Sequence, residues 1–185
     1  MPTRFRPATM NDLEDIVAVF LLCWRESYPT VLPQRLVDAM TDQEASDLWT
    51  RVLRESQPGD VIVAESAQAP PATVLGVARI AVGTAGQGSV HSLYVSPRAQ
   101  GMGVGSQLLS TACDALSASR VEAAGLWVFQ DNAPSIAFYR HHGWLPDGQT
   151  RVQEAFGEPE IRLSKTLRSH HSYGNDAMNW SEAQS

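Results

Sequence analysis

Apolar side chains in the first part of the chain recur at the spacing of a helix. One run, expected to extend to about Tyr28, places on a single helix face Leu13, Ile16, Val17, Phe20 and Trp24. Asn11 with Glu14 three residues later has the spacing of a capping box, which marks a helix start. Residues 3–8 have the character of a short strand. The chain is therefore expected to begin with a strand and an amphipathic helix.

A second capping pattern lies further along, where Thr41 is followed three residues later by Glu44. The helix that it opens carries an apolar face made of Ala45, Leu48, Trp49, Val52 and Leu53. Pro58 and Gly59 end this helix, because a proline cannot continue it and a glycine favours a turn. Two helices therefore precede most of the predicted strands.

The middle of the chain changes to the pattern of strands. Three candidate strands, separated by short loops that favour an antiparallel meander, are residues 61–65, 74–82 and 89–95. After a glycine-rich turn, the pattern predicts helices and strands at residues 103–118, 126–129, 134–142, 149–155 and 160–167. The expected class is α/β, with a mixed, mostly antiparallel sheet of about seven strands flanked by helices.

The last segment, residues 168–185, has no periodicity and consists mostly of small and polar side chains. It is expected to be a disordered tail, because nothing in it forms an apolar face that could dock on a core. Residues 1–167 are expected to form one catalytic domain, which is an ordinary size for a single hydrophobic core.

Charge and composition exclude several function classes. The formal net charge is −6 and Lys165 is the only lysine, so the chain lacks the basic surface that binds nucleic acid. No apolar run has the length of a signal peptide or a membrane span, so we expect a cytoplasmic protein without a membrane partner. The two cysteines, Cys23 and Cys113, lie on apolar helix faces and are expected to be reduced and structural.

The glycine-rich turn at residues 95–106 follows a strand and opens a helix, which is where free backbone N–H groups can bind phosphate. A nucleotide-hydrolysing P-loop requires a lysine before the serine or threonine at the helix start, and none is present here. A dinucleotide fingerprint requires a different glycine spacing and a parallel βαβ unit. A dinucleotide-dependent enzyme therefore stays only as an alternative.

The remaining pattern, Gln100-x-x-Gly103-x-Gly105, resembles the acyl-CoA pyrophosphate signature of the GNAT superfamily of N-acetyltransferases. A second string, which begins at Asn132 and ends at Gly143-Trp144, matches another motif of the same family at the usual distance downstream. The resemblance covers about residues 3–167. It implies a sheet splayed between its fourth and fifth strands, acetyl-CoA as co-substrate, no metal, and direct attack by a primary amine in a ternary complex.

The resemblance also implies roles for individual residues. The residues expected to contact acetyl-CoA are Leu93, Tyr94, Val95, Gln100, Gly101, Met102, Gly103, Val104, Gly105, Ser106, Asn132, Ser135 and Tyr139. Among them, Leu93 and Val95 hold the pantetheine arm through their main chain, and the Val95 N–H stabilises the oxyanion. Asn132 bonds the pantetheine amides, and Tyr139 protonates the leaving sulfur.

The general base is where this sequence departs from the family. Many relatives carry a glutamate six residues before the Val95 position, and that position here is Ser89, which cannot accept a proton at neutral pH. Strand alternation places His91 on the face of Ser89 and Leu93, and an imidazole is a suitable base. Glu26, Tyr28 and a water chain are the other candidates.

The acceptor is not identified by the sequence. The resemblance implies a wall made of Trp24, Glu26 and Tyr28, whose aromatic and acidic groups suit a cationic amine. Polyamines, aminoglycosides, amino acids, a protein N-terminus and a lysine side chain all stay open. The expected partners are this amine-bearing acceptor and, as an option, a second copy of the chain. Because Ser89 replaces the glutamate, a non-catalytic acyl-CoA-binding domain is the second alternative.

Overall fold

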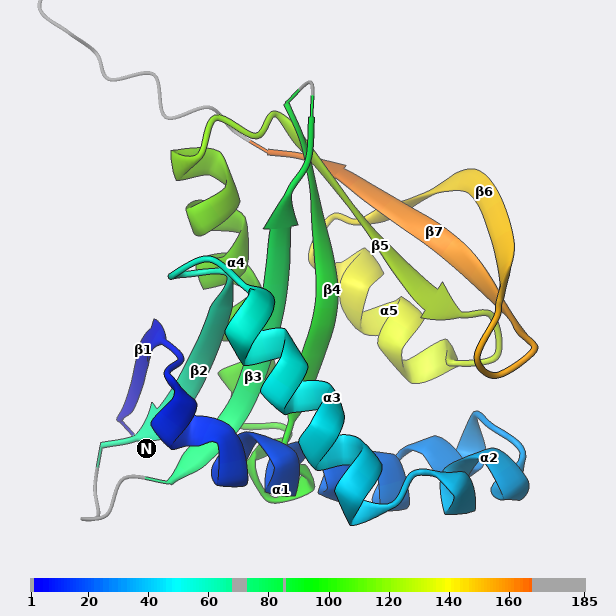
Figure 1. The fold of residues 1–185 in the computed structure, drawn as a ribbon. Helices are drawn as coiled ribbons and strands as arrows, with labels where there is room; N and C mark the ends of the chain where they lie inside the picture. The colour runs from blue at the N-terminus through cyan, green and yellow to red at the C-terminus, as the bar shows by residue number, and fades with distance from the viewer. Residues whose placement is uncertain (1, 68–72, 85, 168–185) are drawn as a thin grey trace, which may run out of the picture.

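The computed structural model describes residues 2–67, 73–84 and 86–167. Its centre is a seven-stranded sheet in the order β1-β2-β3-β4-β5-β7-β6 (Figure 1). The strands are β1 Thr3–Pro7, β2 Val61–Ser66, β3 Val74–Val82, β4 Gln87–Val95, β5 Ala123–Phe129, β6 Leu145–Gln153 and β7 Glu158–Thr166. The residues 168–185 expected to form a tail lie outside the described part of the chain.

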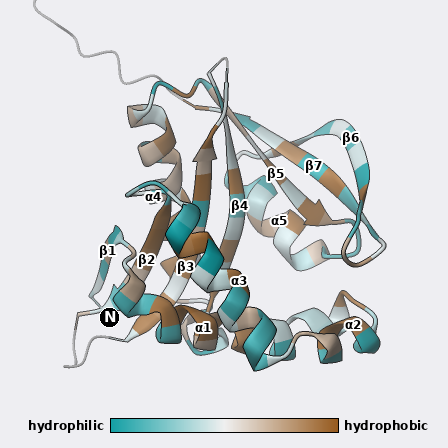
Figure 2. Cartoon of the chain, viewed as in Figure 1, coloured by the Kyte–Doolittle hydropathy of each residue, from teal (hydrophilic) through white to brown (hydrophobic). Residues whose placement is uncertain are grey.

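Helices cover both faces of the sheet (Figure 1). Their bounds are α1 Leu13–Glu26, α2 Gln34–Ala39, α3 Asp42–Glu55, α4 Val104–Ala118 and α5 Ala133–His141. Side chains of α1 and α3 form one core with the sheet, and side chains of α4 and α5 pack with the core on the opposite face. The most apolar segments are the central strands and the helix faces turned toward them (Figure 2). Burial of these apolar surfaces on both faces of the sheet stabilises the fold.

The parallel pairing of β4 with β5 is short. Residues 87–89 pair with residues 123–125, and beyond these positions the two strands have no register partners in each other. The other neighbouring strands in the sheet pair antiparallel. The predicted mixed, mostly antiparallel sheet that splays between its fourth and fifth strands is confirmed.

The start of the first helix differs from the prediction. A 3-10 turn precedes α1, and the capping contacts come from Thr9, whose backbone N–H and hydroxyl both donate to the Asp12 carboxylate. Asp12 is buried and also accepts bonds from Arg6 on β1. The predicted pair of Asn11 and Glu14 was wrong, because this contact with the first strand sets the helix start.

Other element boundaries also moved. The helix α2 was not predicted, and α1 ends at Glu26 instead of Tyr28. The strand β5 begins at Ala123, three residues earlier than predicted, because the small residues 123–125 lie between β4 and β7, which supply partners on both sides. The second capping box, in which Thr41 and Glu44 bond each other reciprocally, is confirmed.

A β-bulge in β4 overturns one argument from alternation. Arg79 pairs with Ser92 and the next residue of β3 pairs with Val90, so His91 is the extra residue. Val90 and Leu93 consequently both pack toward the α4 face, and the Ser89 side chain lies on the other face. The prediction that Leu93 shares a face with Ser89 and His91 was therefore wrong.

Candidate active site

The larger of two neighbouring cavities, of about 670 Å³, lies between the start of α4, the start of α5 and the end of α1. Most of the residues predicted to contact acetyl-CoA line it, namely Leu93, Tyr94, Val95, Gln100, Gly101, Gly103, Gly105, Ser106, Asn132, Ser135 and Tyr139. Met102 is not among them, and its side chain is 48% exposed. Val104 is buried in the core and anchors the start of α4, so only its main chain is available to a ligand.

The backbone of the glycine turn depends on residues without a side chain. Gly101 has φ +75° and Gly103 has φ +79°, a left-handed conformation that strains any other residue type. A Cβ at Gly105 would lie 3.4 Å from the Val95 side chain and 3.6 Å from Phe138. The turn therefore brings the first N–H groups of α4 close to the cavity surface, where a helix start favours an anion.

The edge of β4 that borders the cavity has its main chain directed into the gap. The Ser96 N–H donates to the Leu75 carbonyl on β3, so the Val95 N–H, one residue earlier, points away from β3. The Val95 carbonyl, on that same side, accepts from the Gln100 side chain at 3.2 Å and from the Cys23 thiol at 3.1 Å. Burial raises the pKa of Cys23 to about 11, so this thiol stays neutral.

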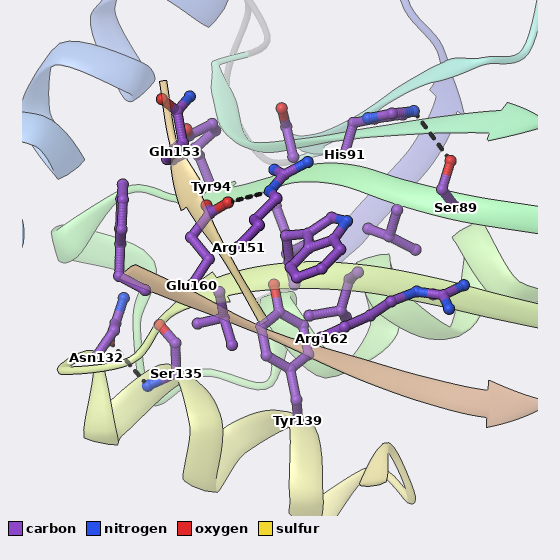
Figure 3. Close-up of a pocket in the computed structure, with 18 of the residues that line it drawn as sticks. Ser89, His91, Tyr94, Asn132, Ser135, Tyr139, Arg151, Gln153, Glu160 and Arg162 are labelled. Atoms are coloured by element: carbon purple, nitrogen blue, oxygen red, sulfur yellow. Dashed lines mark hydrogen bonds and ion pairs between the residues drawn. The ribbon is translucent and has the colours of Figure 1, made fainter. Parts of the chain in front are cut away.

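Two polar residues at the start of α5, Asn132 and Ser135, line this cavity and also the neighbouring one, which Figure 3 shows. The Asn132 Oδ1 atom accepts the Ser135 backbone N–H at 3.1 Å and caps the helix. This bond fixes the side-chain orientation and leaves the Asn132 amino group for another acceptor. Asn132 therefore caps α5 through its oxygen, and its amino group is the part of the side chain that can donate to a ligand.

Tyr139 lies at the centre of the arrangement and lines both cavities. Its ring packs edge-on against Phe138 and Trp144, with centroid distances of 5.3 Å and 6.3 Å. Burial, together with the neighbouring Tyr28, raises the pKa of the Tyr139 hydroxyl well above its usual range. The hydroxyl therefore carries its proton throughout the pH range in which proteins work.

The second cavity, of about 450 Å³, lies between β4, β5, α1 and the hairpin β6-β7. It shares with the first cavity the residues Tyr28, Leu93, Tyr94, Asn132, Ser135 and Tyr139. Burial, and then the proximity of the two hydroxyl groups to each other, governs the pKa of Tyr28 and of Tyr94, and both pKa values are raised. We call this shared set of six residues the junction. Two molecules, one in each cavity, would contact each other at the junction.

Ser89 and His91 line the second cavity, and Figure 3 shows them on the side away from Asn132, Ser135 and Tyr139. The Ser89 Oγ and His91 Nε2 atoms are 2.9 Å apart. Desolvation, with the positive charges of Arg79 and Arg151, lowers the pKa of His91. The imidazole is therefore neutral at pH 7 and can accept a proton.

The predicted acceptor wall is divided between the cavities. Trp24 and Tyr28 line the second cavity and stack on each other with a centroid distance of 4.8 Å. The indole N–H of Trp24 donates to the Val37 carbonyl, so α2 holds this ring in place. Glu26 is exposed and lines the first cavity instead.

Sequence reasoning missed the residues that the hairpin β6-β7 contributes. Glu160 is buried, and its carboxylate accepts the Nε–H of Arg151 at 2.7 Å. Arg162 also lines the second cavity. The available signal was the alternation of Glu160 and Arg162 with the apolar Ile161 and Leu163, which places both charges on one strand face.

The described residues contain neither a candidate metal site nor a candidate membrane span. In residues 2–67, 73–84 and 86–167, no group of three or more histidine, cysteine or acidic side chains is arranged to hold a metal ion. Over the same ranges, no helix combines the length and apolar character of a membrane span.

Comparisons with known proteins agree with this geometry. The model of the acetyltransferase (GNAT) family matches residues 14–144. The uncharacterized N-acetyltransferase YuaI of Bacillus subtilis is 27% identical over 177 residues, which cover 88% of this chain and 96% of that protein. A mycothiol acetyltransferase of Beutenbergia cavernae is 39% identical over 75 residues, which cover 40% of this chain and 24% of that protein.

Solved structures share the fold. The PaiA N-acetyltransferase of Thermoplasma acidophilum, in complex with coenzyme A, has a TM-score of 0.68 at 16% identity and covers 90% of this chain and 99% of that one. A GCN5-related N-acetyltransferase of Rhodopseudomonas palustris has a TM-score of 0.71 at 15% identity, covering 90% and 97%. Since the family model spans most of the sequence, the chain belongs to the acetyltransferase (GNAT) family, whose members take their acetyl group from acetyl-CoA.

Proposed function

We propose that this protein transfers the acetyl group of acetyl-CoA directly to a primary amine of a small-molecule or protein acceptor in a ternary complex. One observation carries the proposal: the cavity at the glycine turn and the cavity at the hairpin meet at the junction, where Tyr139 lines both. A thioester held in the first cavity and an amine held in the second come into contact there, without an intermediate on the protein.

Binding of acetyl-CoA uses mainly backbone groups. The pyrophosphate is held by N–H groups of residues 101–106, and the pantetheine arm lies in the gap beside Leu93 and Val95. Gln100 must release the Val95 carbonyl when the arm binds, because its amide occupies that acceptor in the free protein. Asn132 donates its amino group to a pantetheine carbonyl.

The reaction balances as follows. The ammonium of the acceptor loses one proton to solvent, and the neutral nitrogen attacks the thioester carbon, forming the C–N bond while the carbonyl π electrons move to oxygen. The Val95 N–H stabilises that oxyanion. When the C–S bond breaks, the sulfur leaves with the electron pair and takes the proton of Tyr139, which recovers one from the acetylated nitrogen. The products are an amide, the CoA thiol and one proton.

His91 is the proposed relay for the first proton. It is the only histidine of the described residues that lines the second cavity, and its lowered pKa keeps it unprotonated. It lies beside Ser89 and not at the junction, so a water molecule is needed to connect it with the amine. Glu26 and a water chain alone are the other routes.

A screen of amines tests the proposal. Release of the CoA thiol is measured with acetyl-CoA and a library of primary amines, and turnover with at least one amine is expected. In parallel, CoA should raise the melting temperature while NAD and ATP do not, because the turn has neither a P-loop lysine nor a dinucleotide spacing. Tight CoA binding with no turnover of any amine would show a non-catalytic acyl-CoA-binding domain instead.

A further inference from the structure

The second cavity, which we propose receives the acceptor, is lined by charged side chains of both signs at separate positions. Glu160 is its only carboxylate among the described lining residues, and Arg151 and Arg162 are its guanidinium groups. Buried or partly buried charges are costly unless they are paired or serve a ligand. The distribution of these charges therefore indicates what kind of molecule the cavity accepts.

Glu160 lies at the end of the cavity where acetyl transfer takes place. Burial is the main cause that raises the pKa of the junction residues Tyr28 and Tyr94, and the negative charge of Glu160 adds a smaller contribution to both. It pairs across the sheet with Phe129, the last residue of β5, just before the loop to Asn132. An ammonium group bound to this carboxylate would therefore lie in the second cavity beside the end of β5, on the side of the loop that carries Asn132.

Arg162 lies one step further from the junction. It is two residues along β7 from Glu160, so the two side chains share a face with their Cα atoms about 6.8 Å apart. Its guanidinium covers Gly125 so closely that a Cβ there would be 2.6 Å from Nη2. Asp147 pairs with the Nη1 atom of Arg162 at 3.1 Å. Because Gly125 has no side chain, the Arg162 guanidinium can lie against the backbone of β5 at this position.

Two further arginines belong to this region: Arg151 lines the cavity, and Arg79 does not line it but is close enough to lower the pKa of His91 by its charge, after the larger effect of desolvation. Arg151 lies over the Trp127 ring, with its central carbon 4.3 Å from the centroid, and uses only Nε for its bond to Glu160. Arg79 pairs across the sheet with Ser92, and its buried Nε has no hydrogen-bond partner in the described part of the chain. Within those same residues, no carboxylate forms an ion pair with Arg79.

We propose that the acceptor is an amino acid, whose ammonium binds Glu160 and whose carboxylate is held by the guanidinium groups of Arg162 and Arg151. This inference rests on the proposed function and names its substrate class. A guanidinium is planar and binds a carboxylate through two parallel hydrogen bonds, which fixes its orientation. Polyamines and aminoglycosides are disfavoured, because a second cation in the cavity is repelled by Arg151 and Arg162.

Calorimetry on the full chain saturated with CoA tests the class without requiring turnover. The probes are the proteinogenic amino acids, each compared with its primary amide and its decarboxylated amine. At least one amino acid should bind about tenfold or more tighter than both analogues, because they leave the guanidinium groups unpaired. Thiol release with acetyl-CoA should show the same preference, mainly in KM.

Variants of Arg162 distinguish the loss of its contact with the ligand carboxylate from a loss of protein stability. Arg162→Gln should reduce the preference for the acid over its amide to near unity, and Arg162→Lys should restore part of it. Arg51→Gln, on the exposed face of α3, is the matched control and should leave the preference unchanged. All three proteins are checked for an unchanged affinity for CoA, which shows that the fold survives.

Several results overturn the inference. These are equal or tighter binding of the amide or the decarboxylated amine, no binding of any amino acid, an undiminished preference in Arg162→Gln, or tighter binding of phosphoethanolamine than of every amino acid. The two proposals fail separately. Selective binding of an amino acid without thiol release refutes acetyl transfer but supports an amino acid as the ligand of the second cavity. Equal acetylation of amines that lack a carboxylate supports acetyl transfer but refutes the amino acid as the preferred acceptor.

Discussion

The two cavities that meet at the junction are built by different means. The first cavity, which we propose binds acetyl-CoA, is lined in part by a short contiguous segment, the glycine turn at residues 100–106, whose proposed role depends on its backbone and its glycines. The acceptor cavity is lined by side chains from α1, β4, β5, β6 and β7, which are distant in sequence. A ligand common to the family needs the same backbone shape each time, whereas acceptor choice depends on individual side chains. Changes on one side should therefore leave the other side intact.

The largest effect is expected at the junction, which belongs to both cavities. Tyr139→Phe removes only the hydroxyl, so kcat should fall about 10²-fold while the affinities for CoA and for the acceptor change little. Because the pKa of Tyr139 is raised, kcat of the unaltered protein should not decline on the alkaline side near the usual tyrosine range. Thr111→Val, which removes a hydroxyl bonded to the Gln107 carbonyl, is the control. An unchanged kcat in Tyr139→Phe refutes the acid role.

The next effect should be confined to the acetyl-CoA side. Gly103→Ala introduces a side chain at φ +79°, which misaligns the N–H groups of the turn and should weaken CoA binding roughly 10- to 100-fold. Gly59→Ala is matched to it, because Gly59 has φ +97° and an open environment remote from both cavities. Both variants should lose similar stability to urea. Equal CoA affinity in the two would remove the turn from the binding site.

A third substitution should act only on the acceptor side. Gly125→Ala puts a Cβ where the Arg162 guanidinium lies, so kcat/KM for the acceptor should fall about tenfold with CoA affinity unchanged. Isothermal titration of CoA and thiol-release kinetics measure the two effects on one preparation. A parallel loss of CoA affinity would show that the cavities are not independent.

The smallest effect is a displacement along the pH axis. If neutral His91 relays the proton, kcat/KM should rise with pH as the imidazole deprotonates, and the midpoint should lie below the usual value of about 6.5 because the pKa is lowered. Arg151→Gln removes one of the causes and should move the midpoint upward. His91→Ala should abolish this limb. Persistence of the limb in His91→Ala assigns the proton to Glu26 or to water.

The two sides also differed in how far they could be predicted. The resemblance implied the residues of the acetyl-CoA cavity, and most of them line the first cavity. A short contiguous motif can be recognised in this way because residues adjacent in the chain form the same local backbone structure in related proteins. Glu160 and Arg162 carry no motif and lie outside every predicted set, although their alternation along β7 was visible. Alternation itself failed in β4, where the bulge at His91 separates the face of Ser89 from that of Leu93.

The sequence by itself determined the family, the order of most helices and strands, and the position of the glycine turn that opens α4. These features depend on the periodic spacing of buried residues and on short motifs of residues adjacent in the chain, and both can be recognised in a sequence without knowing the tertiary structure. Only the tertiary structure decided where the first helix starts, that Glu26 lies on the acetyl-CoA side, and that charges from β6 and β7 meet in the acceptor cavity. Each of these results from contacts between distant segments, whose energies depend on how the sheet twists and on which charges are buried together.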